Sequence, residues 1–261
     1  KNSSSPGLKK HFLSLYNSII SKINLSKNSY VLDVGCNDGI LLEIFKQDGY
    51  STIGIDPDKY SLIDANKKGI ITFNSYLNKQ VTAKIINKYG KLKLVVATNV
   101  YSHSDDMTSF TKCISELLEL NGYFVFEVSY LKDLLFSGVW DYVYHEHLAY
   151  HSVKPLQKFL SSLGFELFAV ELLKIKGGSI RCFAQKKNKD ILVRSEIKKI
   201  ISQEEKAGFY DISYRHLQFC LRRQPGNDAS GGSRYPVGNF RFCGGIESQP
   251  RLHPGEGTGL P

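Results

Sequence analysis

Residues 31–39 read Val-Leu-Asp-Val-Gly-Cys-Asn-Asp-Gly, an apolar strand that runs directly into a turn containing two glycines. An apolar segment, Ile40–Gln47, follows the turn and is expected to be a helix. A strand–turn–helix unit brings backbone N–H groups close to a ligand, and glycine permits that close approach. The stretch therefore predicts the first ligand-binding βα unit of an α/β fold.

A second acidic signal lies at Asp56, which follows a short predicted strand, Thr52–Ile55. A carboxylate about 20 residues after the glycine turn is placed to hold the two hydroxyls of a ribose. The pattern Asp33-x-Gly35-x-x-x-Gly39 lacks the third glycine of a dinucleotide site. It resembles instead the binding loop of class I S-adenosylmethionine methyltransferases, although for the loop alone an ordinary βα turn remains the alternative.

Apolar strands alternate with amphipathic helices over most of the chain, which indicates a parallel sheet covered on both faces. Near the end this order changes to two consecutive strands, as in the methyltransferase sheet. The expected fold is therefore a class I, Rossmann-like sheet of seven mostly parallel strands with a terminal antiparallel pair. The predicted helices are 8–23, 40–47, 60–68, 78–89, 106–120 (closed by Asn121-Gly122) and 153–163, and the predicted strands are 30–34, 52–55, 69–73, 92–98, 123–128, 166–172 and 179–185.

Ligands of open α/β sheets bind at the carboxyl ends of the strands. That rule brings the glycine turn, the end of the second strand, the segment 98–103 and the loop after Val128 around one crevice. The expected cofactor is S-adenosylmethionine. The residues expected to bind it are Asp33, Gly35, Cys36, Asn37, Asp38, Gly39, Asp56, Pro57, Thr98 and Asn99.

A cluster of histidines follows the fifth predicted strand, in the run Tyr142-Val-Tyr144-His145-Glu146-His147-Leu-Ala-Tyr150-His151. Three interpretations are open. His147 and His151 have the spacing of a helical zinc pair, but no cysteine lies near them. The run is also compatible with a hydrogen-bonded structural lid. The third interpretation is acid–base catalysis, because methylation at carbon requires a base that removes a proton beside a carbonyl. His103, after the fourth strand, would reach the same crevice.

Five runs occur in an order that resembles the C-methyltransferases of nucleotide-linked keto-deoxysugars: Val34-Gly-Cys-Asn-Asp-Gly39, Asn99-Val-Tyr-Ser-His103-Ser-Asp-Asp, Glu127-Val-Ser-Tyr, Tyr144-His-Glu-His147 and Gly177-Gly-Ser-Ile-Arg181. The resemblance covers about residues 3 to 190. It implies methylation of a sugar carbon next to a ketone, with a nucleoside-diphosphate sugar as substrate.

By the same resemblance, Tyr144 and His147 are the candidate bases, with Glu146 and His103 in supporting roles. The resemblance leaves open which of the two takes the proton. The family usually carries a cysteine-rich zinc domain before this region and a second α/β domain after it. Neither is visible in this chain, and no metal site is expected.

Composition narrows the possible partners. The net charge of +9 suggests nucleic acid, but the lysines are interleaved with apolar residues and no basic run carries aromatic residues. We therefore expect no nucleic-acid partner. The five scattered cysteines suggest reduced thiols in a cytoplasmic protein. No apolar run is long enough for a membrane helix, and we expect a monomer.

The composition changes near residue 220. Every lysine lies at or before Lys206, whereas proline, glycine and arginine accumulate afterwards without an apolar period. Such a segment buries too little apolar surface to offset its ordering entropy. We therefore expect a methyltransferase core at 1–219, beginning with a loop at 1–7, and a tail at 220–261 that is disordered or foreign to the domain.

Overall fold

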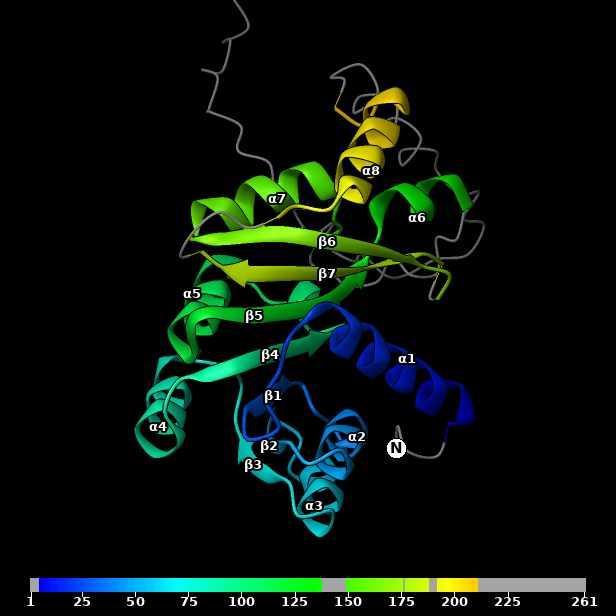
Figure 1. Ribbon diagram of the computed structural model, residues 1–261. Helices are drawn as coiled ribbons and strands as arrows, with labels where there is room; N and C mark the ends of the chain where they lie inside the picture. The colour runs from blue at the N-terminus through cyan, green and yellow to red at the C-terminus, as the bar shows by residue number, and fades with distance from the viewer. Residues whose placement is uncertain (1–4, 138–148, 176, 188–191, 211–261) are drawn as a thin grey trace, which may run out of the picture.

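The computed structural model describes residues 5–137, 149–175, 177–187 and 192–210. These residues form one seven-stranded sheet with helices on both faces (Figure 1). The expected tail at 220–261 lies outside the described residues. So do Tyr144, Glu146 and His147.

The strands follow the order β3-β2-β1-β4-β5-β7-β6. The first five in this order pair in parallel, whereas β7 runs antiparallel to both β5 and β6. This confirms the expected class I methyltransferase sheet with its terminal antiparallel pair. The strands are β1 (Tyr30–Val34), β2 (Ser51–Asp56), β3 (Ile71–Asn74), β4 (Leu92–Thr98), β5 (Leu118–Ser129), β6 (Phe165–Leu173) and β7 (Ser179–Lys186).

Two layers of helices enclose the sheet. One apolar cluster joins the sheet to α1, α2 and α3, and a second joins it to α4, α5, α7 and α8. We call these the α1 face and the α7 face of the sheet. The helices are α1 (Pro6–Lys22), α2 (Ile40–Gln47), α3 (Lys59–Lys67), α4 (Lys79–Tyr89), α5 (Met107–Leu117), α6 (Leu131–Ser137), α7 (Val153–Ser162) and α8 (Ser195–Lys206), with a short 3-10 helix, η2 (Tyr101–His103).

The alternation of side chains along each strand assigns the polar groups to one face. Val31 and Val96 belong to the α1 cluster, so Asp33 and Thr98, two residues further along their strands, lie on the same face. Glu127 likewise follows Val125 on β5. The α1 face therefore carries the ionisable groups at the carboxyl ends of the central strands.

The structure corrects the predicted elements in three places. Helix α5 ends at Leu117, and Asn121-Gly122 lies inside β5, where Asn121 has a positive φ of 62°. These two residues do not close a helix; they lie in the irregular first part of β5, between its two stretches of pairing with β4. Helices α6 and α8 were not among the predicted elements.

Helix α8 is tied to the α7 face by a buried carboxylate. Glu204 is fully buried, and its Oε1 accepts the backbone N–H of Val153 at 2.7 Å. Ser152, at the N-cap of α7, makes no capping hydrogen bond with its own side chain. The unpaired N–H groups at the start of α7 are therefore satisfied by a side chain from another helix.

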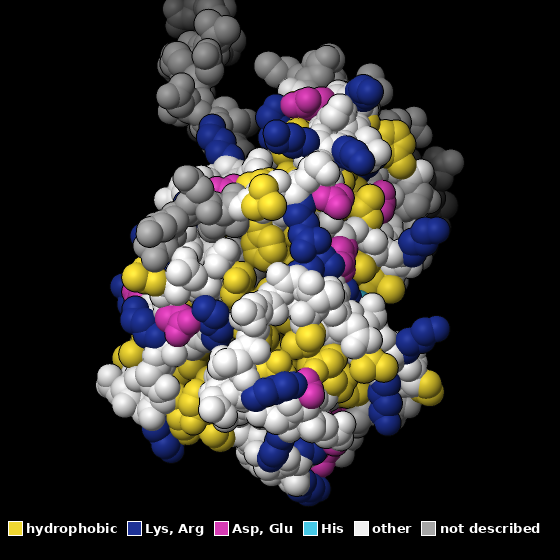
Figure 2. Space-filling view, viewed as in Figure 1, with side chains coloured by type: hydrophobic (Ala, Val, Ile, Leu, Met, Phe, Trp, Pro, Cys, Tyr) yellow, Lys and Arg dark blue, Asp and Glu magenta, His cyan; other side chains and the backbone are white. Residues whose placement is uncertain are grey.

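The surface in Figure 2 shows lysine and arginine side chains scattered among acidic, polar and apolar ones, without a continuous basic stripe on that face. None of the described helices is long and apolar enough to cross a membrane. Within the described ranges, Cys36, Cys113 and Cys182 are buried free thiols.

Candidate cofactor site

The loop between β1 and α2 is held in a left-handed conformation at three positions. Gly35, Asn37 and Gly39 have φ values of 76°, 49° and 73°. A Cβ at Gly35 would lie 2.3 Å from a methyl of Val100, so the close packing also requires glycine there. The Gly35 N–H donates to the Ile55 carbonyl at 2.8 Å, which fixes the loop onto β2.

Asp56, at the end of β2, is hydrogen-bonded both to this loop and to the residue before α3. Its Oδ2 accepts the Asn37 N–H at 2.8 Å, and its Oδ1 accepts the Asp58 N–H at 2.8 Å. Each carboxylate oxygen can accept a further hydrogen bond, so both retain capacity for ligand hydroxyls. The residue expected from the sequence as a ribose ligand thus also orders the glycine loop.

Asp33 lies on β1, two residues before Gly35, and is 2% exposed. Burial, together with the negative charges of Asp56 and Glu127, raises the pKa of its carboxyl well above the usual value. Its Oδ1 and the Oδ1 of Asn37 have no hydrogen-bond partner among the described residues. The end of β1 is thus rich in acceptors, as a ligand with a positive charge and several donors requires.

Residues at the end of β4 form the side of the candidate site opposite Asp56. Thr98 is buried, and Asn99 adopts a positive φ of 57° while its N–H donates to the Glu127 carbonyl at 3.0 Å. Strained backbone of this kind is concentrated at functional sites. His103 follows on η2 and is exposed. The structure therefore brings Thr98 and Asn99 to the same edge as the glycine loop.

Three expected contact residues have other surroundings. The Cys36 thiol packs against β2, where a Cβ at Gly54 would approach its sulfur to 2.5 Å. The Asp38 carbonyl accepts a hydrogen bond from the Lys68 ammonium at 3.0 Å. Pro57 is exposed. Whether any of them contacts a ligand stays a prediction.

The candidate bases Tyr144 and His147, and Glu146 between them, lie outside the described residues, so their roles stay predictions. His151, at the end of the same run, is described. It is buried, its ring stacks on Tyr101 at 6.3 Å between centroids, and burial lowers its pKa from 6.5 to about 4. His151 is therefore a neutral imidazole inside the α7 face. Within the described ranges, no group of three His, Cys, Asp or Glu residues could hold a metal ion.

An ionic network on the α1 face was not predicted from the sequence. Glu127 is fully buried and contacts both the Arg181 Nε and the His11 Nε2 at 2.7 Å. One signal was present in the sequence: a single carboxylate interrupts the apolar strand Tyr123-Phe-Val-Phe-Glu-Val128. A charge buried in a central strand requires a partner, which the spacing alone could not identify.

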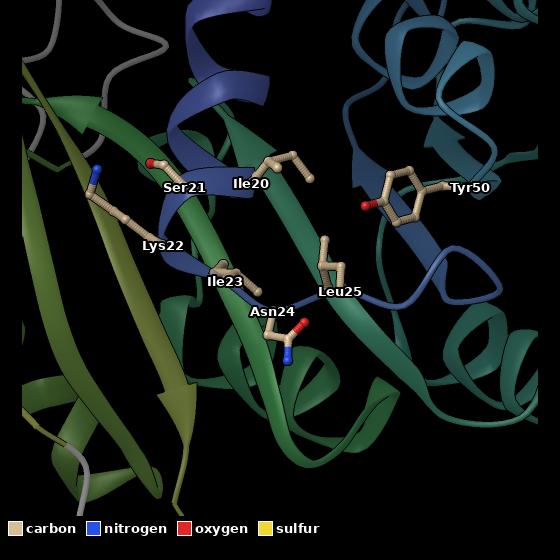
Figure 3. Close-up of a pocket in the computed structure, with 7 residues that line it drawn as sticks. All are labelled: Ile20, Ser21, Lys22, Ile23, Asn24, Leu25 and Tyr50. Carbon is tan, nitrogen blue, oxygen red and sulfur yellow. The ribbon is translucent and has the colours of Figure 1, made fainter.

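A hollow of about 400 Å³ lies at the opposite edge of the sheet (Figure 3). It is lined by residues 20–25, at the end of α1 and the start of the next loop, and by Tyr50, which precedes β2. These residues lie at the amino ends of β1 and β2. The hollow is therefore remote from the glycine loop and is not a candidate for the cofactor site.

Comparison with known proteins defines the class. Residues 10–170 match the family model described as "Methyltransferase domain", and the chain belongs to this family. It is also similar in fold to the magnesium protoporphyrin IX methyltransferase from Synechocystis PCC 6803, solved with bound S-adenosylhomocysteine. The TM-score is 0.56 at 16% identity, covering 69% of this chain and 84% of the other. The expected fold and, at the level of the family, the expected cofactor S-adenosylmethionine are confirmed.

Two relatives are similar to this chain in sequence. The chain is 29% identical over 214 residues to the C-methyltransferase NovU from Streptomyces niveus, which covers 82% of this chain and 51% of the relative. It is 27% identical over 157 residues to a mitochondrial ubiquinone biosynthesis O-methyltransferase from Bos taurus, with 54% of this chain and 42% of the relative covered. The chain thus spans about half the length of these relatives or less.

Proposed function

We propose that this domain methylates a carbon next to a ketone in a nucleotide-linked deoxysugar. The observation that carries the proposal is the similarity to a C-methyltransferase over 82% of the chain. The runs Tyr144-His-Glu-His147 and Gly177-Gly-Ser-Ile-Arg181, which resemble the sugar C-methyltransferases, fall within the same similarity. They support carbon rather than oxygen as the acceptor atom.

The proposed cofactor contacts use groups at the carboxyl ends of three neighbouring strands, β2, β1 and β4. Asp56 holds the ribose hydroxyls, and the backbone of Gly35–Gly39 approaches the cofactor closely. Asp33, Thr98 and Asn99 face its methionine end. S-Adenosylmethionine, when bound, supplies a methyl group activated by a positively charged sulfonium. An acceptor-rich wall suits that charge, because the carboxylates are already repelling one another.

The chain must supply the base. We propose that His147 removes the proton from the sugar carbon, with Tyr144 as the competing candidate. Glu146 orients the imidazole, and His103 supports the same reaction from the segment after β4. Loss of the C–H proton leaves electron density on the carbon and on the ketone oxygen. That carbon would then take the methyl group from the sulfonium, whose S–CH3 bond would break to leave S-adenosylhomocysteine.

The placement of this run is supported by His151, a described residue four positions after His147. The backbone N–H of His151 donates to the Ser129 carbonyl, and the backbone N–H of Leu131 donates to the His151 carbonyl at 2.9 Å. Both contacts lie at the end of β5. The chain therefore re-enters the described structure beside the carboxyl edge, within four residues of His147.

Mass spectrometry of nucleoside-diphosphate keto-sugars after incubation with the chain and S-adenosylmethionine tests the proposal. We expect one sugar to gain a methyl group on carbon. A second measurement isolates the proton transfer: exchange of the sugar α-hydrogen with deuterated solvent, without cofactor.

His147→Asn is expected to abolish both methyl transfer and exchange while cofactor affinity is unchanged. Exchange that persists in His147→Asn but is lost in Tyr144→Phe would identify the tyrosine as the base. If neither variant slows exchange, the run is structural and the proposal of carbon methylation loses its chemical basis.

Two other functions are tested by the same assays. The similarity to an O-methyltransferase favours, as a second candidate, a small-molecule O- or N-methyltransferase, which would methylate without α-hydrogen exchange. A cofactor-binding fragment without activity would bind S-adenosylmethionine but no nucleoside-diphosphate sugar. Parallel calorimetric titrations with the two ligands distinguish this fragment from an enzyme.

We also propose that residues 1–219 form the functional domain and that 220–261 contributes nothing to it. The composition of the tail predicts little burial of apolar surface. Deletion of 224–261 should therefore leave the melting temperature nearly unchanged, and a large decrease would show that the tail packs onto the domain.

A further inference from the structure

The ionic network around Glu127 has no role in the function proposed above. The Glu127 carboxylate is shared between the Nε2 of His11, on α1, and the Nε of Arg181, on β7. Arg181 continues the network through its Nη1, which donates to Glu171 at 2.9 Å. Lys22 pairs with Glu171 from the other end of α1. The network thus joins α1 to three strands of the sheet.

The network determines which nitrogen of His11 is available. Burial alone would raise the pKa of Glu127, but His11 and Arg181 outweigh it and lower the pKa. The ionised carboxylate can only accept hydrogen bonds, so the Nε2 of His11 carries the proton. The Nδ1 has no hydrogen-bond partner among the described residues, and the side chain is 13% exposed. In the tautomer that carries its proton on Nε2, the Nδ1 is an acceptor.

The position of Glu127 brings His11 to the candidate cofactor site. Glu127 pairs with Thr98 in the β4–β5 register, and its carbonyl accepts the N–H of Asn99. Asp33 lies on the same face, and its pKa is sensitive to the charge of Glu127. The imidazole is therefore beside the wall that Thr98 and Asn99 form. In contrast, the Nη2 of Arg181 is sealed inside the protein, so Arg181 acts by holding Glu127.

The order of strands gives the direction of the cofactor. Asp56 is on β2, and β1, β4 and β5 follow it across the sheet. With the ribose at Asp56, the methionine end extends toward β4 and β5. We infer that His11 is a further cofactor-binding residue, whose Nδ1 accepts a hydrogen bond from the ammonium group at the amino-acid end of S-adenosylmethionine. This inference rests on the proposed cofactor orientation.

Three ligands test the contact in His11→Gln. The glutamine Nε2 can replace the histidine Nε2–H toward Glu127, but the variant has no acceptor in place of Nδ1. Calorimetry should show affinity for S-adenosylmethionine and S-adenosylhomocysteine reduced about tenfold. Affinity for 5′-methylthioadenosine, which lacks the amino-acid end, should be unchanged. The melting temperature without ligand should remain close to that of the wild type.

Two further variants separate binding from folding. His11→Asn keeps a polar group near Nδ1 but leaves a Glu127 oxygen unpaired, so it should lower the melting temperature. Lys10→Gln, at the exposed neighbouring position on α1, should bind all three ligands like the wild type. Equal losses for S-adenosylmethionine and 5′-methylthioadenosine in His11→Gln, or no loss for either, would overturn the inference alone. A wild-type chain that binds none of the ligands would overturn the proposed function together with it.

Discussion

At the carboxyl edge of the sheet, the two faces differ in the surroundings of their buried ionisable groups. On the α1 face, Asp33 and Glu127 are acidic residues on central strands, and of the two only Glu127 is paired with a cation, Arg181. On the α7 face, the corresponding region is aromatic: Tyr101 packs on Phe126 at 4.9 Å and stacks on His151. One face concentrates unmatched acceptors, and the other holds a neutral imidazole between apolar rings.

The difference shows what each face contributes. Unmatched carboxylates raise one another's pKa values, which costs stability unless a cation or a donor-rich ligand reaches them. The α1 face is therefore the side of the sheet on which we propose that the ligand binds. On the α7 face, the aromatic packing buries apolar surface instead and holds His151 in place. Under this proposal, ligand binding and aromatic packing are divided between the two sides of one sheet.

Asp56→Asn should produce the largest effect and tests the α1 face directly. The substitution keeps the shape of the side chain but removes the charge and one acceptor, so both the ribose contact and the Asn37 N–H bond weaken. Each charge-assisted hydrogen bond contributes roughly 1.5–3 kcal/mol, so calorimetry should show at least about a tenfold loss of S-adenosylmethionine affinity.

Asp58→Asn is the matched control for that experiment. Asp58 caps α3 through the N–H groups of Tyr60 and Ser61, and asparagine caps a helix about equally well. The control should retain both fold and affinity. A folded Asp56→Asn chain with wild-type affinity would remove Asp56 from the site.

Local sequence patterns were sufficient to predict most of the strands and helices that form the two faces of the sheet. The strand 92–98 and the helix 40–47 match β4 and α2 because each has a continuous apolar pattern and a clear glycine or polar boundary. The glycine loop was recognisable for the same reason. The proximity of Asp56 to this loop could be predicted from spacing alone, since Asp56 lies on the next strand in sequence.

The remaining features depend on contacts that no local pattern contains. His11 meets Glu127 across 116 residues of sequence, and Arg181 meets Glu127 across 54. Helix α8 has a polar sequence whose apolar residues, Ile197 and Ile200, are buried only by the α7 face. Asn121-Gly122 carries a strong turn signal, but the pairing of β5 with β4 and β7 overrides it.

His151→Phe tests the α7 face through the dependence of stability on pH. The pKa of His151 is lowered from 6.5 to about 4, so the unfolded chain binds a proton more tightly than the folded one. Stability is therefore fully present above about pH 6.5 and is lost as the pH falls toward 4. Between pH 7 and 5 this contribution should cost the wild type about 2 kcal/mol.

Urea unfolding at the two pH values measures that cost. Phenylalanine preserves the ring stack on Tyr101 and does not titrate, so the variant should lose less stability than the wild type by about that amount. Parallel losses in the two chains would show that His151 is not the neutral buried group described above.

Asp33→Asn should have the smallest effect and the opposite sign. The raised pKa means that the folded chain keeps the proton while the unfolded chain releases it above its ordinary value, about 3.9. The wild type therefore loses stability as the pH rises from that value, whereas asparagine does not titrate. Thermal unfolding without ligand should show similar melting temperatures near pH 4. At pH 7 the variant should melt at a higher temperature than the wild type.

The same substitution should weaken S-adenosylmethionine binding, because the Asp33 carboxyl can ionise when the positively charged methionine end approaches, whereas the amide cannot. A residue that destabilises the fold but binds a ligand gives this result when it is replaced: the variant is more stable and binds the ligand more weakly. Asp105→Asn, at an exposed carboxylate after η2, should change neither quantity. If Asp33→Asn instead lowers the melting temperature at pH 7, Asp33 stabilises the apo fold, and the α1 face does not differ from the α7 face in the way argued here.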